Sequence, residues 1–140
     1  MEEIERIFNV GVCASVRSRP YYNTLIKRIE REKGIKINPC WCSNPNDLYL
    51  LLNEETNLAG KKDKIEVSYL VTELLFNMTS KEGLHMLKPL KNEFPGLPVI
   101  VCEMYGKEYF PKIRDEYGYE CIEKHLEDDK LIEAVSRYLK

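Results

Sequence analysis

Hydrophobic positions along the chain follow two alternating patterns. Short, mostly apolar runs of the kind that form buried strands cover 7–13, 35–38, 67–76, 99–102 and 120–123. Between these runs, apolar residues recur every three or four positions, which predicts amphipathic helices. The predicted helices begin near Pro20, Pro45, Thr79, Tyr109 and Asp128, and two of them are expected to end at Gly34 and Gly118.

Strands that alternate with helices in this way indicate an α/β domain with a parallel sheet covered by helices on both faces. We expect the flavodoxin-like, doubly wound fold with five strands in the order 2-1-3-4-5. The run 67–76 is the predicted central strand, and Glu73 falls near its carboxyl end, where open α/β sheets place their ligand sites. The segment 39–44 is expected to be a loop, and the polar segment 53–64 an exposed connection.

The composition narrows the class of protein. The 140 residues fit a single domain covering 1–140, with 44% apolar and 31% charged residues as in soluble globular proteins. The net charge of −2 gives no general attraction to nucleic acid. No apolar run is long enough to span a membrane, and the acidic N-terminus has no signal-peptide core. We therefore expect a cytoplasmic protein whose cysteines are thiols.

Four segments match successive parts of one known family. The segment 70–73 ends a strand in a carboxylate, 83–87 opens a helix with Gly-Leu-x-x-Leu, 97–101 is a strand led by Leu-Pro, and 117–124 is a strand closed by a lysine. In this order they resemble the third strand, third helix, fourth strand and fifth strand of receiver domains in two-component response regulators. The resemblance implies a signal-transduction domain that is not an enzyme.

The residues that carry receiver chemistry differ from the family pattern. The resemblance places Glu73 at the phosphoacceptor position, where receivers have aspartate, and 13–17 where they have the acidic pair that holds Mg²⁺. A hard cation prefers carboxylate oxygens, which 13–17 lacks, so we expect no metal site and no cofactor. The longer glutamate side chain would also misplace the attacking oxygen, and a misplacement of ~1 Å can cost ~10²-fold in rate.

The resemblance also places the switch positions of receivers at Glu103 and Cys121, and their lysine at Lys124. We expect Glu73 to pair with Lys124 across the crevice, which would fix one conformation without phosphate. Two close carboxylates do not both ionise freely, so we expect Lys124 to lie between or beside Glu73 and Glu103. The alternatives are a solvated Glu73 at the strand end and a Glu103 that points to solvent.

These observations indicate a degenerate receiver domain that acts by phosphorylation-independent contact with another protein. A free-standing structural adaptor is an alternative. The chain ends soon after the predicted fifth helix, so its output is expected to come from a separate partner or from self-association. We expect a monomer or a homodimer whose contact face is the fourth helix, fifth strand and fifth helix, with apolar anchors at Tyr109, Phe110, Tyr117, Tyr138 and Leu139.

A competing hypothesis rests on the Cys-x5-Arg spacing of Cys13 and Arg19 between a strand and a helix. It resembles the phosphate loop of low-molecular-weight tyrosine phosphatases and the phosphocysteine loop of sugar-phosphotransferase subunits. A helix N-terminus lowers a cysteine pKa and binds phosphate, and an arginine clamps its oxygens. However, the loop has no glycine for close backbone approach and the chain has no Asp-Pro for a general acid. A buried thiol at Cys13 is the simpler expectation.

Three further candidates are weaker. Cys40 and Cys42 make only half of a zinc site, because no second pair lies close in sequence. His85 and His125 are expected to be surface or cap residues, not ligands or catalytic bases.

Overall fold

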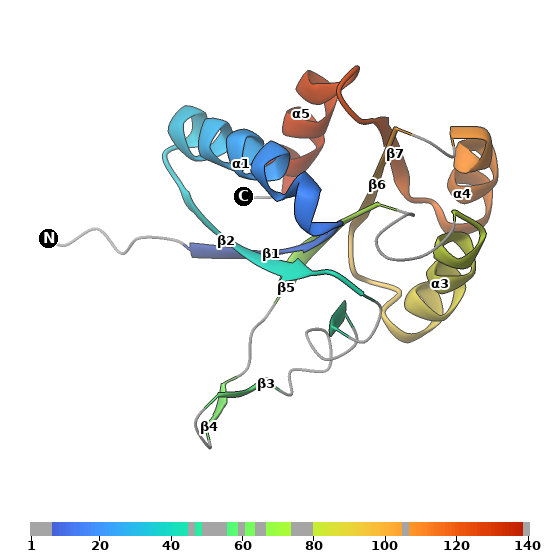
Figure 1. The fold of residues 1–140 in the computed structure, drawn as a ribbon, viewed down its shortest axis with the longest axis horizontal. Coiled ribbons are helices and arrows are strands. Elements are labelled where there is room, and N and C mark those ends of the chain that lie inside the picture. The colour runs from blue at the N-terminus through green and yellow to red at the C-terminus, as the bar shows by residue number, and fades with distance from the viewer. Residues whose placement is uncertain are drawn as a thin grey trace, which may run out of the picture.

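The computed structural model describes residues 7–44, 47–48, 56–58, 61–63, 67–73, 80–104 and 107–138. Its main sheet has five parallel strands in the order β2-β1-β5-β6-β7 (Figure 1). Their bounds are β1 (Ile7–Cys13), β2 (Lys36–Cys42), β5 (Val67–Thr72), β6 (Val99–Glu103) and β7 (Glu120–Glu123). This is the predicted flavodoxin-like order, because β5, β6 and β7 are the third, fourth and fifth strands of this sheet.

Helices cover both faces of this sheet. Helices α1 (Arg19–Lys33) and α5 (Asp128–Tyr138) lie on one face, and α3 (Ser80–Glu93) and α4 (Phe110–Tyr117) lie on the other (Figure 1). Short 3-10 turns at Val16–Ser18 and Lys107–Tyr109 lead into α1 and α4. Gly34 and Gly118 end their helices as predicted, since each has a left-handed backbone with φ of 65° and 68°. None of the described helices is long and apolar enough to cross a bilayer.

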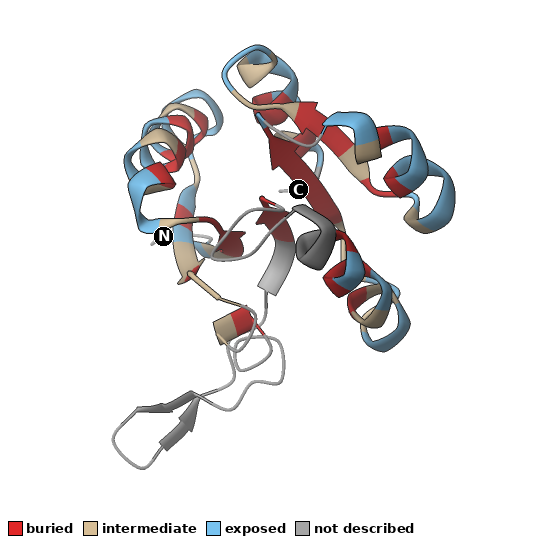
Figure 2. Ribbon diagram, turned by 45° about the vertical axis from the view of Figure 1, so that its right-hand side comes forward, coloured by how far each residue is buried: buried red, intermediate tan, exposed pale blue. Residues whose placement is uncertain are grey.

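Two apolar clusters, one on each face, hold these layers together (Figure 2). In the first cluster, Tyr22, Leu25, Ile26 and Ile29 of α1 pack with α5 against the sheet. In the second, Leu84, Leu87, Leu90 and Ile113 of α3 and α4 pack against the opposite face. Every residue of β6 is buried, as expected for a central strand of a two-sided parallel sheet.

Strand β2 corrects one prediction. The segment 39–42, expected to be part of a loop, continues the strand to Cys42 in register with β1. The proline at 39 suggested a loop because proline cannot donate to a sheet ladder. It is tolerated here because β2 lies at the margin of the sheet, where no strand among the described residues pairs with its outer side.

The segment 53–64, expected to be an exposed connection, contains regular structure. It contains a small antiparallel hairpin of β3 (Thr56–Leu58) and β4 (Lys61–Asp63), separate from the main sheet. A two-residue spacing that includes a glycine suits such a hairpin. Most of the helix predicted from Pro45, the start of the helix predicted at Thr79, and 74–76 of the predicted central strand lie outside the described residues.

Candidate functional site

The carboxyl ends of the parallel strands bring four chain segments to one end of the sheet. Glu73 directly follows β5, and its backbone N–H donates to the carbonyl oxygen of Cys13 at 2.8 Å. Lys124 directly follows β7, and its N–H donates to the carbonyl oxygen of Glu103 at 3.1 Å. Helix α1 begins at the same end, after β1. Parallel strands therefore gather side chains from distant positions in the sequence, as at other ligand sites of open α/β sheets.

Glu73 and Lys124 form the predicted ion pair. The Lys124 Nζ atom lies 2.7 Å from Glu73 Oε2, and the two side chains are only 11% and 7% exposed. The alternative of a solvated Glu73 is therefore wrong. A short, charge-assisted contact of this kind is strong, and removing one partner would leave a buried charge without compensation.

Two side chains from the start of α1 complete the site. The Tyr22 hydroxyl donates to Glu73 Oε2 at 2.9 Å, and the Ser18 hydroxyl donates to Glu73 Oε1 at 3.3 Å. Lys124 Nζ donates in turn to Ser18 Oγ at 2.8 Å. We call these four residues, Ser18, Tyr22, Glu73 and Lys124, the closed ring. Both carboxylate oxygens of Glu73 are occupied by partners within it.

Sequence reasoning missed Ser18 and Tyr22, although a signal for them was present. They are spaced four residues apart at the start of the first helix, which places them on one helix face. The strand order puts that helix start beside the end of the central strand. Polar side chains on that face could therefore have been expected to reach Glu73.

Aromatic rings surround the lysine of the closed ring. Lys124 Nζ lies 5.2 Å from the ring centroid of Tyr21 and 5.7 Å from that of Tyr22, within reach of cation–π attraction. Burial, followed by the nearby Cys102 and Glu73, raises the pKa of Tyr22 well above its ordinary value. Tyr22 therefore stays a neutral phenol and remains a hydrogen-bond donor to Glu73.

Glu103 ends β6 and is buried, with 3% of its surface exposed, so the alternative that it points to solvent is wrong. Its Oε1 atom accepts from the backbone N–H of Met104 at 3.2 Å. The pKa of Cys102 is raised to about 12, mainly by burial; a hydrogen bond with Tyr22 and the charge of Lys124 lower it, and the charges of Glu73 and Glu103 raise it. The charges of the two acids and the lysine therefore all act on the Cys102 thiol. A direct contact between the Glu103 carboxylate and Lys124 stays a prediction.

Cys121 lies apart from the closed ring in the described contacts. It belongs to the cluster under α3 and α4, and its thiol lies 3.9 Å and 3.8 Å from the carbonyl oxygens of Phe110 and Tyr119. Burial raises the pKa of Cys121 to about 11. Its equivalence to a receiver switch position stays a prediction.

The structure separates Cys13 from Arg19, the two residues of the competing phosphate-loop hypothesis. Cys13 has no exposed surface and belongs to the cluster on the α3 and α4 side, whereas α1 covers the other face. Burial, followed by its contact with Cys42, raises the pKa of Cys13 well above its usual value. Arg19 Nη2 instead donates to Ser43 Oγ at 3.0 Å, and its guanidinium lies 5.5 Å from the Trp41 ring centroid. Cys13 is thus the expected buried thiol. A nucleophilic cysteine would need an exposed thiolate instead.

The remaining candidates stay outside any cluster of ligands. Cys40 is half-buried and Cys42 is buried, and the described ranges contain no group of three His, Cys, Asp or Glu side chains that could hold a metal ion. His85 on α3 and His125 after β7 are both exposed, as expected for surface residues.

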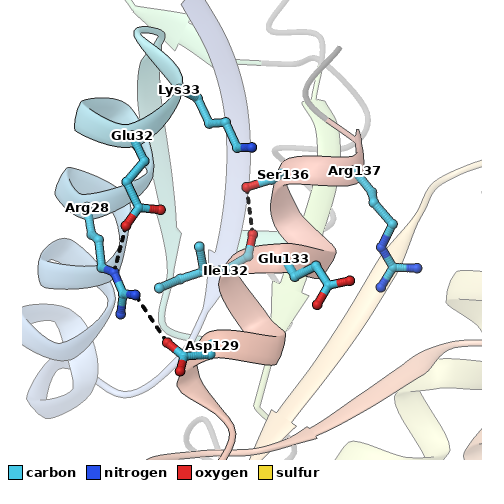
Figure 3. A pocket seen from close by; sticks show the side chains of 8 residues that line it. All are labelled: Arg28, Glu32, Lys33, Asp129, Ile132, Glu133, Ser136 and Arg137. Carbon is cyan, nitrogen blue, oxygen red and sulfur yellow. Dashed lines mark hydrogen bonds and ion pairs between the residues drawn. The ribbon is translucent and has the colours of Figure 1, made fainter.

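A surface hollow of about 490 Å³ between α1 and α5 contains none of the closed-ring residues (Figure 3). Arg28 bridges two acids in it, with Nε 3.1 Å from Glu32 and Nη2 3.2 Å from Asp129. Exposed pairs of this kind typically contribute ~0–1 kcal/mol each. We therefore interpret the hollow as a charged seam between the helices.

Comparisons with known proteins support the fold. No protein-family model matches the chain, and no curated protein matches it in sequence. Solved structures that resemble it include a response regulator from Thermotoga maritima, with a TM-score of 0.64, 18% identity, and 94% of this chain and 98% of that chain covered. A response regulator receiver domain protein from Clostridium thermocellum has a TM-score of 0.63 and 14% identity, with 94% of this chain and 94% of that chain covered. A CheY-like receiver domain protein from Methanospirillum hungatei JF-1 has a TM-score of 0.62 and 13% identity, with 96% of this chain and 94% of that chain covered. At these identities the likeness shows the fold alone, and it agrees with the flavodoxin-like strand order.

Proposed function

We propose that this chain is a receiver-like signalling domain that acts through protein contact without being phosphorylated. The observation that carries the proposal is the closed ring, in which the Glu73 carboxylate is already held by Lys124, Tyr22 and Ser18. The position that would accept a phosphoryl group in a receiver is thereby filled by the chain's own side chains.

The chemistry of phosphoryl acceptance argues the same way. An attacking carboxylate needs a free oxygen in line with the donor, and the donor's charge must be neutralised, usually by Mg²⁺. Both oxygens of Glu73 have partners in the closed ring. The segment 13–17 at the end of β1 offers a thiol, a hydroxyl and an arginine where a hard cation would require carboxylates.

The closed ring also links three elements. Ser18 ends the 3-10 turn that leads into α1 and Tyr22 lies in the first turn of that helix, whereas Glu73 follows β5 and Lys124 follows β7. In a signalling domain this arrangement would keep one surface presented to a partner at all times. Under this proposal, partner abundance or an event at the site itself sets the output, not a phosphodonor.

The surface that we propose for the partner is the face of α4, β7 and α5. A hollow of about 340 Å³ there is lined by Arg114, Glu120, Cys121, Ile122, Lys130, Glu133 and Arg137. One expected anchor is wrong, because Phe110 is only 5% exposed and belongs to the core. Tyr109 and Tyr117 are partly buried against that core, and the side chains of Tyr138 and Leu139 lie outside the described residues. The face is thus more charged than the sequence predicts.

The test of the proposal is treatment with acetyl phosphate and Mg²⁺, followed by intact-mass measurement. We expect no gain of a phosphoryl group, because Glu73 is occupied and the acidic pair is missing. A receiver domain with the usual aspartate serves as the positive control. A stable mass gain of one phosphoryl group on Glu73, absent from a Glu73→Gln variant, would show that the site accepts phosphate and would overturn the proposal.

A further inference from the structure

The residue after Lys124 has a strained backbone. His125 has a φ of 71°, and it is the one residue other than glycine with a positive φ among those the structure describes. This left-handed conformation is unfavourable for residues with a Cβ atom and persists only where surrounding contacts hold it. The position of the strain, directly beside the closed ring, suggests that the turn is kept in place for Lys124.

Besides the hydrogen bonds of the turn with β6 and β7, Tyr21 of α1 contacts this turn at two points. The backbone N–H of His125 donates to the Tyr21 hydroxyl at 3.3 Å, and the two rings meet edge to face at 4.6 Å between centroids. The Tyr21 hydroxyl donates to the carboxylate of Asp128, the first residue of α5. One side chain of α1 therefore ties together the start and the end of the turn between β7 and α5.

The same ring faces the lysine. Lys124 Nζ lies 5.2 Å from the Tyr21 ring centroid, and the Tyr21 and Tyr22 rings lie 5.0 Å apart. Tyr21 therefore contacts the turn through its hydroxyl and the ammonium group through its ring. If the hydroxyl contacts were lost, His125 could relax to an ordinary φ, which would move the residue that precedes it.

We propose that Tyr21 is a positioning residue that latches the turn 124–128 in its strained form and so keeps Lys124 on Glu73. Releasing Tyr21 from the turn withdraws Lys124 and opens the closed ring. The latch gives the phosphorylation-independent domain of the proposed function a way to change state, and it rests on that proposal. It places the point of regulation at the contact of α1 with the β7–α5 turn.

The test measures how fast the Lys124 amine is acylated by acetic anhydride, relative to Lys130, whose side chain is 69% exposed. Peptide mass spectrometry separates the two lysines. In the native chain Lys124 is expected to react much more slowly. A Tyr21→Phe variant keeps the ring and loses the hydroxyl, so we expect Lys124 to react about five- to tenfold faster while Lys130 is unchanged.

A rescue variant distinguishes positioning from simple packing. Glycine adopts a positive φ without the cost of a Cβ atom, so adding His125→Gly to Tyr21→Phe is expected to slow Lys124 acylation back toward the native rate. The matched control is Tyr119→Phe, because the Tyr119 hydroxyl has no hydrogen-bond partner among the described residues. It is expected to leave Lys124 acylation unchanged.

The outcomes separate the latch from the proposed function. A Tyr21→Phe variant with native Lys124 acylation, or a rescue variant that reacts as fast as Tyr21→Phe alone, would overturn the latch and leave the proposed function standing. A native protein in which Lys124 reacts as fast as Lys130 would overturn the closed ring, on which both ideas depend.

Discussion

At the scale of single residues, the site is organised by the buried carboxylate of Glu73, whose partners are side chains of the protein itself. Glu73 accepts from Tyr22 and Ser18 and pairs with Lys124, so its charge is balanced inside the fold. Buried pairs of this kind do not necessarily add stability relative to apolar residues, but breaking one is costly. In some proteins such a pair fixes one arrangement, which agrees with a site that needs no ligand to be ordered.

Replacing Glu73 with glutamine tests this balance. We expect Glu73→Gln to lower the free energy of unfolding by ~3–5 kcal/mol, because Lys124 would be left buried without its counter-charge. Urea denaturation measures the loss. The matched control is Glu116→Gln, which removes an exposed pair with Lys112 at 3.9 Å and is expected to change stability by less than ~1 kcal/mol. Equal effects for the two substitutions would contradict a buried pair at Glu73.

The Glu73–Lys124 contact is predicted from the resemblance to receiver domains, which places Glu73 at the end of the central strand and Lys124 at the end of the fifth. The four-residue spacing of Ser18 and Tyr22 places them on one helix face, but spacing alone does not say which face packs toward the site. Tyr22 is at once a core residue of α1 and a donor to Glu73, and an apolar stripe in the sequence reveals only the first role.

At the scale of elements, helices and strands end where local backbone chemistry requires it. Gly34 stops α1 with a φ of 65°, and its N–H donates to the carbonyl oxygen of Glu30 at 2.9 Å. Such ends are readable in the sequence because glycine adopts this conformation most easily. The length of β2 could not be predicted from the sequence, because proline at position 39 is compatible both with a loop and with an edge strand.

A glycine pair tests the helix end. We expect Gly34→Ala to lower the free energy of unfolding by ~1–2 kcal/mol, since alanine is strained at positive φ. Gly96→Ala is the control, because Gly96 lacks a positive φ and an added Cβ meets nothing within 4 Å. There we expect no loss of stability. Chemical denaturation of both variants provides the measurement, and similar losses would mean that the left-handed cap is not what α1 depends on.

At the scale of the whole molecule, the proposed partner face combines opposite charges around the β7 edge. Arg137 Nη2 lies 2.9 Å from Glu120 Oε1, and Arg114 Nη2 donates to the carbonyl oxygen of Cys121 at 3.1 Å. A surface that mixes both signs can be complementary to a second copy of itself across a two-fold axis. This agrees with a chain that is a monomer or forms a homodimer through this face.

Measuring the oligomeric state tests this proposed partner face. We expect light scattering to give the mass of one or two chains of 16.5 kDa. If a dimer forms, Lys130→Glu should lower its fraction, because Lys130 lines the hollow on this face. Lys88→Glu, a charge reversal on the exposed side of α3, should leave the fraction unchanged. A dimer that is equally populated in the two variants must use another surface.

The proline in β2 has a consequence for how copies of the molecule can associate. An open sheet has two margins, and here they are formed by β2 and β7. Pro39 has no N–H to offer an incoming strand at the first margin, and Arg114 already occupies a backbone carbonyl at the second. Both features disfavour growth of the sheet from one molecule into the next by strand addition. Copies of this protein are therefore expected to associate through side-chain contacts and not by extending one another's sheets into fibrils.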